Sequence, residues 1–446
     1  MTNTMPSKRT NYRWVVMALI FIVYAIACAD RANLGVALPF MKKEFNISNT
    51  EAGAIVSLFG FAYAVVQIPA GLFYKRVSAL TANRIFPIFL SLVSIFTGLM
   101  GTTSSTLLLK LYRVGLGLTE GPLGIGCTNI INRWFPPKEK GTATGLWIAA
   151  SKVGPVIVPP VCVIIVELWG WREIFFAFAI PGIILSILWY FMVTVKPTDS
   201  KFCSPAEVEY IEKELAPAVI DKSPAVRVSR DFGWLDKINR TKKVVPLKTV
   251  SEVCRSWNVL GDAIGYGCMI GISNTFMLWI PSYLMNVKGF TSIKMGFLAS
   301  APFVGAVMGN TLGGWMSDRI FAKRRKPSMI IGALCTIVMM AALIYAPNNA
   351  GYLGLMLLLA GLLLGFGYAG FSVYPMGLTT KDAYPVAFGI VNTGGQLGGA
   401  VAPLIVGIIL DAYSWTAVFM YLALSSVLCF TVLASIDEPI DGAKAS

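Results

Sequence analysis

Five charged residues lie within long apolar stretches of the sequence. Asp30 and Arg31 are adjacent in the segment CADRANLGVALP, and Lys152 lies in AASKVGPVIVPP. Arg113 and Glu120 lie seven residues apart in RVGLGLTEGPLGIG, which is two helical turns, so both share one helix face about 10 Å apart. An isolated ion at the centre of a bilayer costs at least ~2.5–3.5 kcal/mol, so such groups normally face a cavity and pair with one another.

These charges allow two interpretations. They can be ion pairs that only hold helices in register, or a site that binds protons and a charged solute. Five charges on three helices exceed what register requires, which favours the site. Carboxylates shielded from water bind protons readily, and a guanidinium binds a carboxylate through two parallel hydrogen bonds.

The sequence lacks the residues that metal-binding, cysteine-based or nucleotide-binding sites require. The 446 residues include no histidine, the commonest metal ligand and the usual side chain that titrates near neutral pH. The eight cysteines form no CxxC pair, and no GxxxxGK[ST] loop for a nucleotide occurs. We therefore expect no enzyme, no metal and no cofactor, and any proton chemistry must use carboxylates or lysine.

The charged residues belong to helices that cross a membrane. The chain is 56% hydrophobic and only 13% charged, about half the charge of a soluble domain. Its apolar runs approach the ~20 residues that span ~30 Å of hydrocarbon. The predicted spans are 14–38, 52–74, 84–101, 107–131, 142–166, 174–195, 259–285, 296–317, 327–346, 352–378, 385–410 and 416–435.

Basic residues cluster in alternate connections between these spans. The odd-numbered connections hold only Lys42, Lys43, Arg172, Lys288 and Lys294, whereas the others and the N-terminal tail hold most of the remainder. This asymmetry places both termini and the central segment 196–258 in the cytoplasm. It also accounts for the net charge of +14 without a nucleic-acid partner.

The chain divides into two related halves. We expect six-helix bundles over 1–195 and 259–446, joined by a cytoplasmic segment 196–258 with a helix over 204–215 and an otherwise charged linker. At an offset of 244 residues, glycine, proline and aromatic positions recur in pairs. These pairs are Gly117 and Gly361, Gly121 and Gly365, Gly145 and Gly389, Gly154 and Gly398, Pro159 and Pro403, and Trp171 and Trp415. Such spacing indicates duplication, as in transporters built from repeats.

The duplication also exposes an asymmetry in charge. At the same offset, Asp30 meets Asn274 and Lys152 meets Gln396, while Arg113 and Glu120 each meet a leucine. We infer that the N-terminal half handles ions and protons. The C-terminal half would then offer uncharged hydrogen-bonding groups to the solute.

The pattern resembles the major facilitator superfamily, and more closely its anion:cation symporter family, which includes sugar-acid permeases. The motifs are Asp30-Arg31-Ala32-Asn33, Arg113-x3-Gly117-x2-Glu120-Gly121, Asn132-x-Trp134-Phe135-Pro136 and Glu139-x-Gly141. The superfamily's loop motif is well formed over residues 313–319, where Gly314, Asp318 and Arg319 would act in gating. In the matching stretch of the N-terminal half, Lys75 replaces the expected aspartate.

The resemblance implies roles for individual residues. Asp30 and Glu120 would take up and release protons, with Arg113 tuning their proton affinity, and Arg31 would hold the carboxylate of the substrate. Lys152, where relatives often carry glutamine, either forms a salt bridge or lines the substrate site, and we favour the second. The other candidate substrate contacts are uncharged: Asn274, Ser372, Tyr374, Asn392 and Gln396. Phe276 and Trp279 are more readily explained by packing.

These observations predict an all-α transporter of twelve helices in two pseudo-symmetric bundles, acting as a monomer in the cytoplasmic membrane. It would import a sugar acid, a hexonate or hexuronate, with protons by alternating access. Two alternatives stay open: a proton-antiport exporter of a drug or metabolite, and a membrane sensor that binds solute without transporting it.

Overall fold

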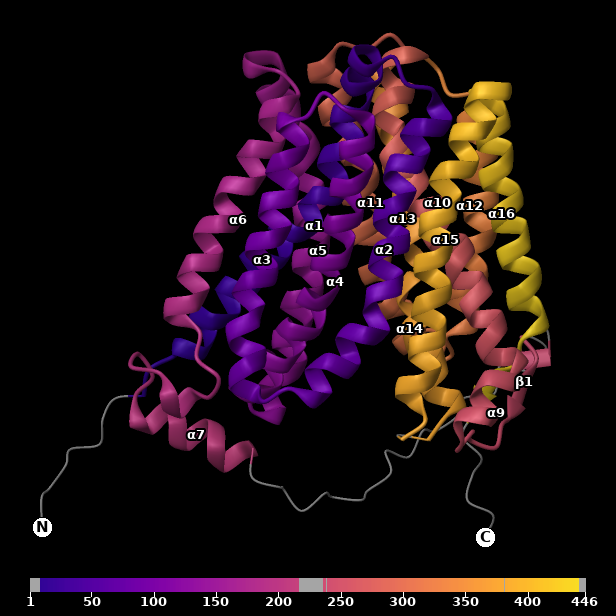
Figure 1. The fold of residues 1–446 in the computed structure, drawn as a ribbon. Coiled ribbons are helices and arrows are strands. Elements are labelled where there is room, and N and C mark those ends of the chain that lie inside the picture. The colour runs from indigo at the N-terminus through magenta and orange to yellow at the C-terminus, as the bar shows by residue number, and fades with distance from the viewer. Residues whose placement is uncertain (1–8, 216–235, 238, 381, 441–446) are drawn as a thin grey trace, which may run out of the picture. The chain divides into compact units, whose positions relative to one another are not determined.

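The computed structural model of the chain describes residues 9–215, 236–237, 239–380 and 382–440, and most of them are helical (Figure 1). The long helices of the first half are α1 (Tyr12–Phe45), α2 (Asn49–Arg76), α3 (Ala79–Thr102), α4 (Thr106–Trp134), α5 (Pro137–Trp169) and α6 (Arg172–Met192). Those of the second half are α10 (Trp257–Asn286), α11 (Ser292–Arg319), α12 (Lys326–Ile344), α13 (Ala350–Phe366), α14 (Tyr368–Leu378), α15 (Tyr384–Ala412) and α16 (Trp415–Ser435).

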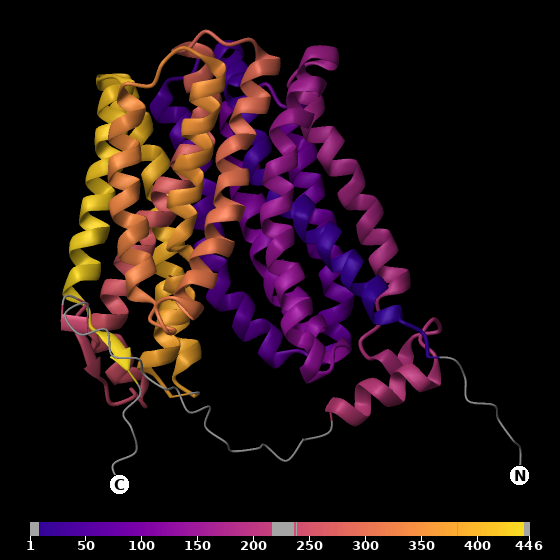
Figure 2. The same cartoon turned by 180° about the vertical axis from the view of Figure 1, so that it is seen from behind.

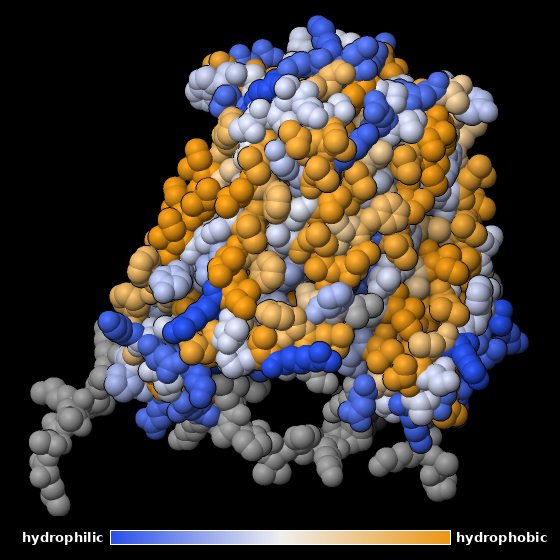
Figure 3. Space-filling model, viewed as in Figure 1, coloured by the Kyte–Doolittle hydropathy of each residue, from blue (hydrophilic) through white to orange (hydrophobic). Residues whose placement is uncertain are grey.

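The twelve predicted spans coincide with these helices to within a few residues, counting α13 and α14 as one span. Within the described residues, eleven helices are long and apolar enough to cross a membrane. The remaining predicted span forms α4, which has 29 residues but carries Lys110, Arg113 and Glu120. Apolar side chains cover the outward sides of the helices, and hydrophilic ones gather toward the helix ends (Figure 3). The all-α prediction is confirmed.

Internal contacts divide the chain into two units. Unit 1 comprises Met1–Ala37 and Ala62–Pro224, and unit 2 comprises Leu38–Phe61 and Ala225–Ser446. The end of α1 and the beginning of α2 thus group with unit 2, where an added Cβ at Gly60 would lie 2.8 Å from Ala400 Cβ of α15. The predicted boundaries at 195 and 258 stay a prediction.

Close helix contacts hold each unit together. In unit 1, α3 packs along α6, and Phe86 stacks on Trp189 with ring centroids 4.1 Å apart. In unit 2, α11 meets α13 through Gly305, Gly309 and Gly313, where an added Cβ would lie 1.7–2.0 Å from a carbonyl oxygen of α13. Small residues at such spacing let membrane helices approach closely.

The central segment is more ordered than the sequence predicts. The predicted helix over 204–215 is confirmed as α7 (Pro205–Leu215), which follows the short 3-10 helix η1 (Pro197–Asp199). The prediction of a linker is wrong for the last part, which forms β1 (Thr241–Lys243) and α9 (Val250–Arg255). β1 pairs in parallel with β2 (Glu438–Ile440), a contact between distant segments that hydropathy does not reveal. Residues 216–235 lie outside the described part.

Candidate functional site

Arg31 of α1 and Glu120 of α4 form an ion pair within unit 1. Both Nε and Nη2 of Arg31 donate to Glu120 Oε1, at 3.1 and 2.7 Å. The guanidinium carbon lies 4.8 Å from the centroid of the Tyr63 ring of α2, in cation–π range. The side chain of Arg31 is 37% exposed, whereas that of Glu120 is only 3% exposed. The pair therefore joins a shielded acid to an arginine that is partly exposed.

Asp30 lies beside this pair in the sequence but has different partners. Thr97 Oγ1 of α3 donates to Asp30 Oδ2 at 2.8 Å, and Asn33 Nδ2 donates to Oδ1 at 2.9 Å. The side chain is 2% exposed, so neutral donors satisfy both oxygens of a buried acid. Sequence analysis missed Thr97, whose only signal is a hydroxyl in an apolar run. Asn33 belongs to the motif Asp30-Arg31-Ala32-Asn33, and its amide contact with Asp30 adds a structural role to that position.

Arg113 supplies the second positive charge of this region. It is 2% exposed on α4, and its charge acts on both Asp30 and Glu120. Two arginines and two carboxylates therefore gather in unit 1, as the sequence predicts. Such an arrangement balances charge internally, and any added anion or lost proton disturbs that balance.

Lys152 belongs to the same neighbourhood. It is half-buried on α5, and its charge acts on Cys28 of α1 together with those of Asp30, Arg31 and Glu120. Helix α5 approaches α1 closely here, because an added Cβ at Gly154 would lie 2.2 Å from the carbonyl oxygen of Ala25. The role of Lys152 as a substrate contact stays a prediction.

The uncharged candidates of unit 2 gather on two helices. Asn274 of α10 is exposed, and its Nδ2 would lie 2.6 Å from a Cβ added at Gly399 of α15. Gly399 follows Gln396 by three residues and Asn392 by seven, so these positions share one face of α15. Both side chains are half-buried. The structure therefore brings three predicted amide groups to one helix pair.

The remaining candidates of unit 2 lie elsewhere or pack. Ser372 is half-buried on α14, whereas Tyr374 is 1% exposed and its hydroxyl donates to the carbonyl oxygen of Asp437. Phe276 and Trp279 are 2% and 1% exposed, which agrees with the packing interpretation. Tyr374 is thus directed toward the C-terminal segment rather than toward the amide groups.

The loop motif lies at the end of α11. Asp318 is 54% exposed and pairs with Arg325 at 2.7 Å, while Arg325 also donates to Ser317 Oγ at 2.9 Å. Gly314 is half-buried and Arg319 is exposed. The pairing joins α11 to α12 across their short connection, and the gating role stays a prediction. The Lys75 side chain lies outside the described part.

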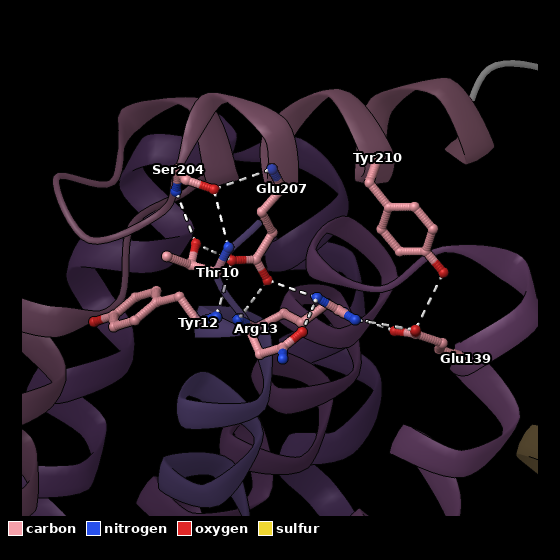
Figure 4. Close-up of polar contacts among 8 residues, drawn as sticks. Thr10, Tyr12, Arg13, Glu139, Ser204, Glu207 and Tyr210 are labelled. Carbon is pink, nitrogen blue, oxygen red and sulfur yellow. Dashed lines mark hydrogen bonds and ion pairs between the residues drawn. The ribbon is translucent and has the colours of Figure 1, made fainter. Parts of the chain in front are cut away.

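A polar network that sequence analysis missed ties the chain's beginning to the central segment, and we call it the Glu207 network (Figure 4). Arg13 donates to Glu139 Oε2 at 2.7 Å and to Glu207 Oε1 at 2.8 Å. Glu207, with 0% exposure, also accepts from Thr10 Oγ1 at 2.6 Å and from the backbone N–H of Tyr12 at 2.9 Å. Helix α7 lies against the start of α1 in both Figures 1 and 2.

The donors of this network set the charge of Glu207. Burial raises the pKa of Glu207, but the hydrogen bonds from Thr10, Arg13 and the backbone outweigh burial and hold the pKa below its usual value. Glu207 is therefore ionised at neutral pH. The signal in the sequence was Glu139 in a family motif, although its partners lie 126 and 71 residues away.

A second network, the Glu438 network, ties the C-terminal segment to α12. Glu438 is 2% exposed and accepts from the backbone N–H of Arg325 at 2.9 Å and of Lys326 at 2.7 Å. Lys326 Nζ donates to the carbonyl oxygens of Asn239 and Ile436, at 2.9 and 2.6 Å. Burial raises the pKa of Glu438 to about 7, and the two backbone donors oppose that rise.

Metal ligands are not grouped in the part of the chain that the structure describes. No set of three or more His, Cys, Asp or Glu side chains there lies close enough to hold a metal ion. The polar groups of unit 1 are instead acids paired with arginines and hydroxyls, an arrangement suited to binding protons and anions.

Comparisons with known proteins agree with this chemistry. The sequence profile of the Major Facilitator Superfamily matches residues 20–298 and 263–446. A D-galactonate transporter of Escherichia coli O6:H1 is 29% identical over 94% of this chain and 93% of its own. A probable galactarate/D-glucarate transporter of Bacillus subtilis is 27% identical over 92% of this chain and 88% of its own. A bacterial homologue of the human lysosomal transporter Spinster shares the fold, with a TM-score of 0.73, 15% identity and 96% coverage of both chains.

Proposed function

Because the chain belongs to the Major Facilitator Superfamily and is a membrane transporter rather than an enzyme, we propose that it imports a sugar acid by proton symport. The observation that supports this most directly is the ion pair between Arg31 and Glu120. It places an accessible guanidinium on a shielded carboxylate, with a second shielded acid, Asp30, next in the sequence.

The pair suggests how a proton and an anion become coupled. A proton on Glu120 removes the charge that holds Arg31, which frees both donors of the guanidinium for the substrate carboxylate. A substrate carboxylate on Arg31 in turn removes the cation that keeps Glu120 ionised, so it favours protonation. By linkage, each ligand strengthens the binding of the other by the same factor. Proton and anion would then travel together.

The substrate class follows from the acid-binding arginine and the amides of unit 2. Asn274, Asn392 and Gln396 both donate and accept hydrogen bonds, which suits the hydroxyls of a hexonate or hexuronate. Similar proteins carry the names of galactonate, galactarate/D-glucarate and hexuronate transporters. A monocarboxylate matches Arg31 best, since Arg113, the other arginine of this described cluster, is buried, and Lys152 would add a second cation near Arg31.

Location and assembly are part of the proposal. The transporter would lie in the inner membrane of a bacterium, with both termini and the central segment in the cytoplasm and a monomer as the functional form. The distribution of lysine and arginine supports this orientation.

Reconstituted proteoliposomes test the proposal. We expect an inward proton gradient to drive accumulation of D-galactonate or a hexuronate, and a protonophore to abolish accumulation while sparing exchange. Glucose, which has the hydroxyls but no carboxylate, is the matched control and should not be carried. Uptake that ignores the pH gradient would remove the symport claim, and uptake only against the gradient would indicate an exporter. Binding without counterflow would indicate a sensor.

A further inference from the structure

One buried acid of unit 2 takes no part in the proposed coupling of proton and anion. Asp262 is the sixth residue of α10 and is 0% exposed. Neither of its carboxyl oxygens has a hydrogen-bond partner among the described residues. At the 244-residue offset its counterpart in the first half is Ala18, so the duplication does not explain it.

The titratable neighbours of Asp262 are neutral groups, and two of them donate their protons to backbone carbonyl oxygens. Tyr266 on α10, Tyr374 on α14 and Cys429 on α16 are the titratable groups that face it. The hydroxyl of Tyr374 donates to the Asp437 carbonyl, and Cys429 Sγ donates to the Gly265 carbonyl at 3.5 Å. From α9, α11 and α15, no charged group of the described residues acts on Asp262.

Glycines next to Asp262 along α10 pack closely against other segments of unit 2. An added Cβ at Gly261 would lie 2.5 Å from Ile436 Cγ2, and one at Gly265 would lie 3.2 Å from Phe371. Phe371 stacks on Tyr266 with ring centroids 5.2 Å apart. Burying an ionised carboxylate among such groups costs several kcal/mol of free energy. No cation of the described residues pairs with Asp262 to offset that penalty.

We propose that Asp262 is a further proton-binding carboxyl beside Asp30 and Glu120, protonated in this conformation and able to exchange its proton when α10 moves. The exchange is simple: the carboxylate takes a proton from water and returns it, with no other bond changed. Helices α10 and α15 meet closely through glycines, and the alternating access of the proposed function would supply the motion of α10. An added Cβ at Gly267 would lie 2.8 Å from the Gly394 carbonyl, and one at Gly398 would lie 2.1 Å from the Gly267 carbonyl.

Infrared spectroscopy of the purified full chain tests the proton directly and needs no substrate. We expect protonated-carboxyl absorbance at neutral pH that disappears as the buffer becomes alkaline, with separate components from Asp262 and from Glu438, whose pKa is about 7. Asp262→Asn should lose one component of this band, whereas Asp382→Asn, which removes an exposed acid of the same unit, should retain the full band. A band unchanged by Asp262→Asn would overturn the proposal.

Thermal unfolding provides a second readout if spectra are crowded. Replacing a neutral, unpartnered acid by an isosteric amide or by leucine should leave the melting temperature within about 2 °C or raise it. A fall of more than about 5 °C in both variants would mean that Asp262 is ionised and paired, which contradicts the proposal.

Participation in transport rests on the proposed function and has its own readout. In proteoliposomes, Asp262→Asn should lower the ratio of proton-driven uptake to exchange of D-galactonate about tenfold, with exchange retained. An unchanged ratio would show that the proton never leaves Asp262 during transport and would refute its exchange. If D-galactonate is not carried at all, the infrared and melting results still decide the protonation of Asp262.

Discussion

The buried acids of the two units have different kinds of partner. In unit 1, the described buried acids are Asp30, Glu120 and Glu207, and side-chain donors reach every one of them. In unit 2, they are Asp262 and Glu438, and no side-chain donor among the described residues bonds to either. Two backbone N–H groups donate hydrogen bonds to Glu438, whereas no donor among the described residues reaches Asp262.

This difference bears on which acids hold a charge. An arginine or hydroxyl compensates the loss of water around a carboxylate, so a buried acid in unit 1 can stay ionised until a ligand competes for its partner. A buried acid without such a partner favours the neutral form. We therefore expect the buried acids of unit 1 to exchange charge with ligands, and those of unit 2 to favour the neutral form.

The largest effect should come from Arg31, which pairs with Glu120 and is proposed to hold the carboxylate of the solute. Arg31→Lys keeps the charge but loses the two-donor geometry, so we expect binding of the sugar acid to weaken about 100-fold. Isothermal titration calorimetry with D-galactonate measures it. Lys201→Gln, a change at an exposed cation of the same unit, is the control. Equal affinity in Arg31→Lys would show that Arg31 does not hold the carboxylate.

The next prediction separates coupling from transport. Asp30→Asn and Glu120→Gln should each reduce proton-driven uptake at least about tenfold and reduce exchange much less, because neutral amides cannot carry a proton. Paired uptake and counterflow assays in proteoliposomes make the comparison. If both activities fell together, the two acids would be structural and the contrast between the units would fail.

A smaller effect should follow at the Glu207 network. Glu207→Gln loses the ion pair with Arg13, so we expect about 1–3 kcal/mol less stability for the docking of α7. Hydrogen exchange of the α7 amides measures it. Glu209→Gln, an exposed acid on the same helix, is the matched control. Identical exchange in both variants would contradict the assigned role of Glu207.

The last prediction concerns a dependence on pH at the Glu438 network. Burial raises the pKa of Glu438 to about 7, so its folded-state pKa exceeds the unfolded value of about 4.3. The contribution to stability is then complete below about pH 4.3 and is lost as the pH rises through about 7.

We expect protection of the β1 and β2 amides from hydrogen exchange, corrected for intrinsic rates, to fall across that window. The Glu438→Gln variant should lack this dependence. The Glu207 network has the opposite sign, because the pKa of Glu207 is lowered and its contribution is lost only in acid. A matching pH response of both networks would break the comparison.

Much of this organisation follows from hydropathy and spacing. The apolar runs predict the long helices, and the seven-residue spacing of Arg113 and Glu120 predicts their shared face. Helix rotation and depth are not encoded in such one-dimensional patterns. Hydropathy therefore cannot predict that Thr97 reaches Asp30, that Arg13 joins residues 126 and 194 positions away, or that Asp262 lies among neutral side chains. The expectation of uncharged groups in the second half does not include the buried Asp262.

The composition of α4 has a consequence for biogenesis. This helix carries Lys110, Arg113 and Glu120, and it is the one long helix of the described chain that fails a simple membrane-span criterion. Transfer of such a segment from the translocon into lipid by itself is unfavourable, since each central ion opposes insertion. We therefore expect helix α4 to enter the bilayer alongside α1, whose Arg31 pairs with Glu120. The residues proposed to couple transport would then also make membrane integration of the first half a cooperative event.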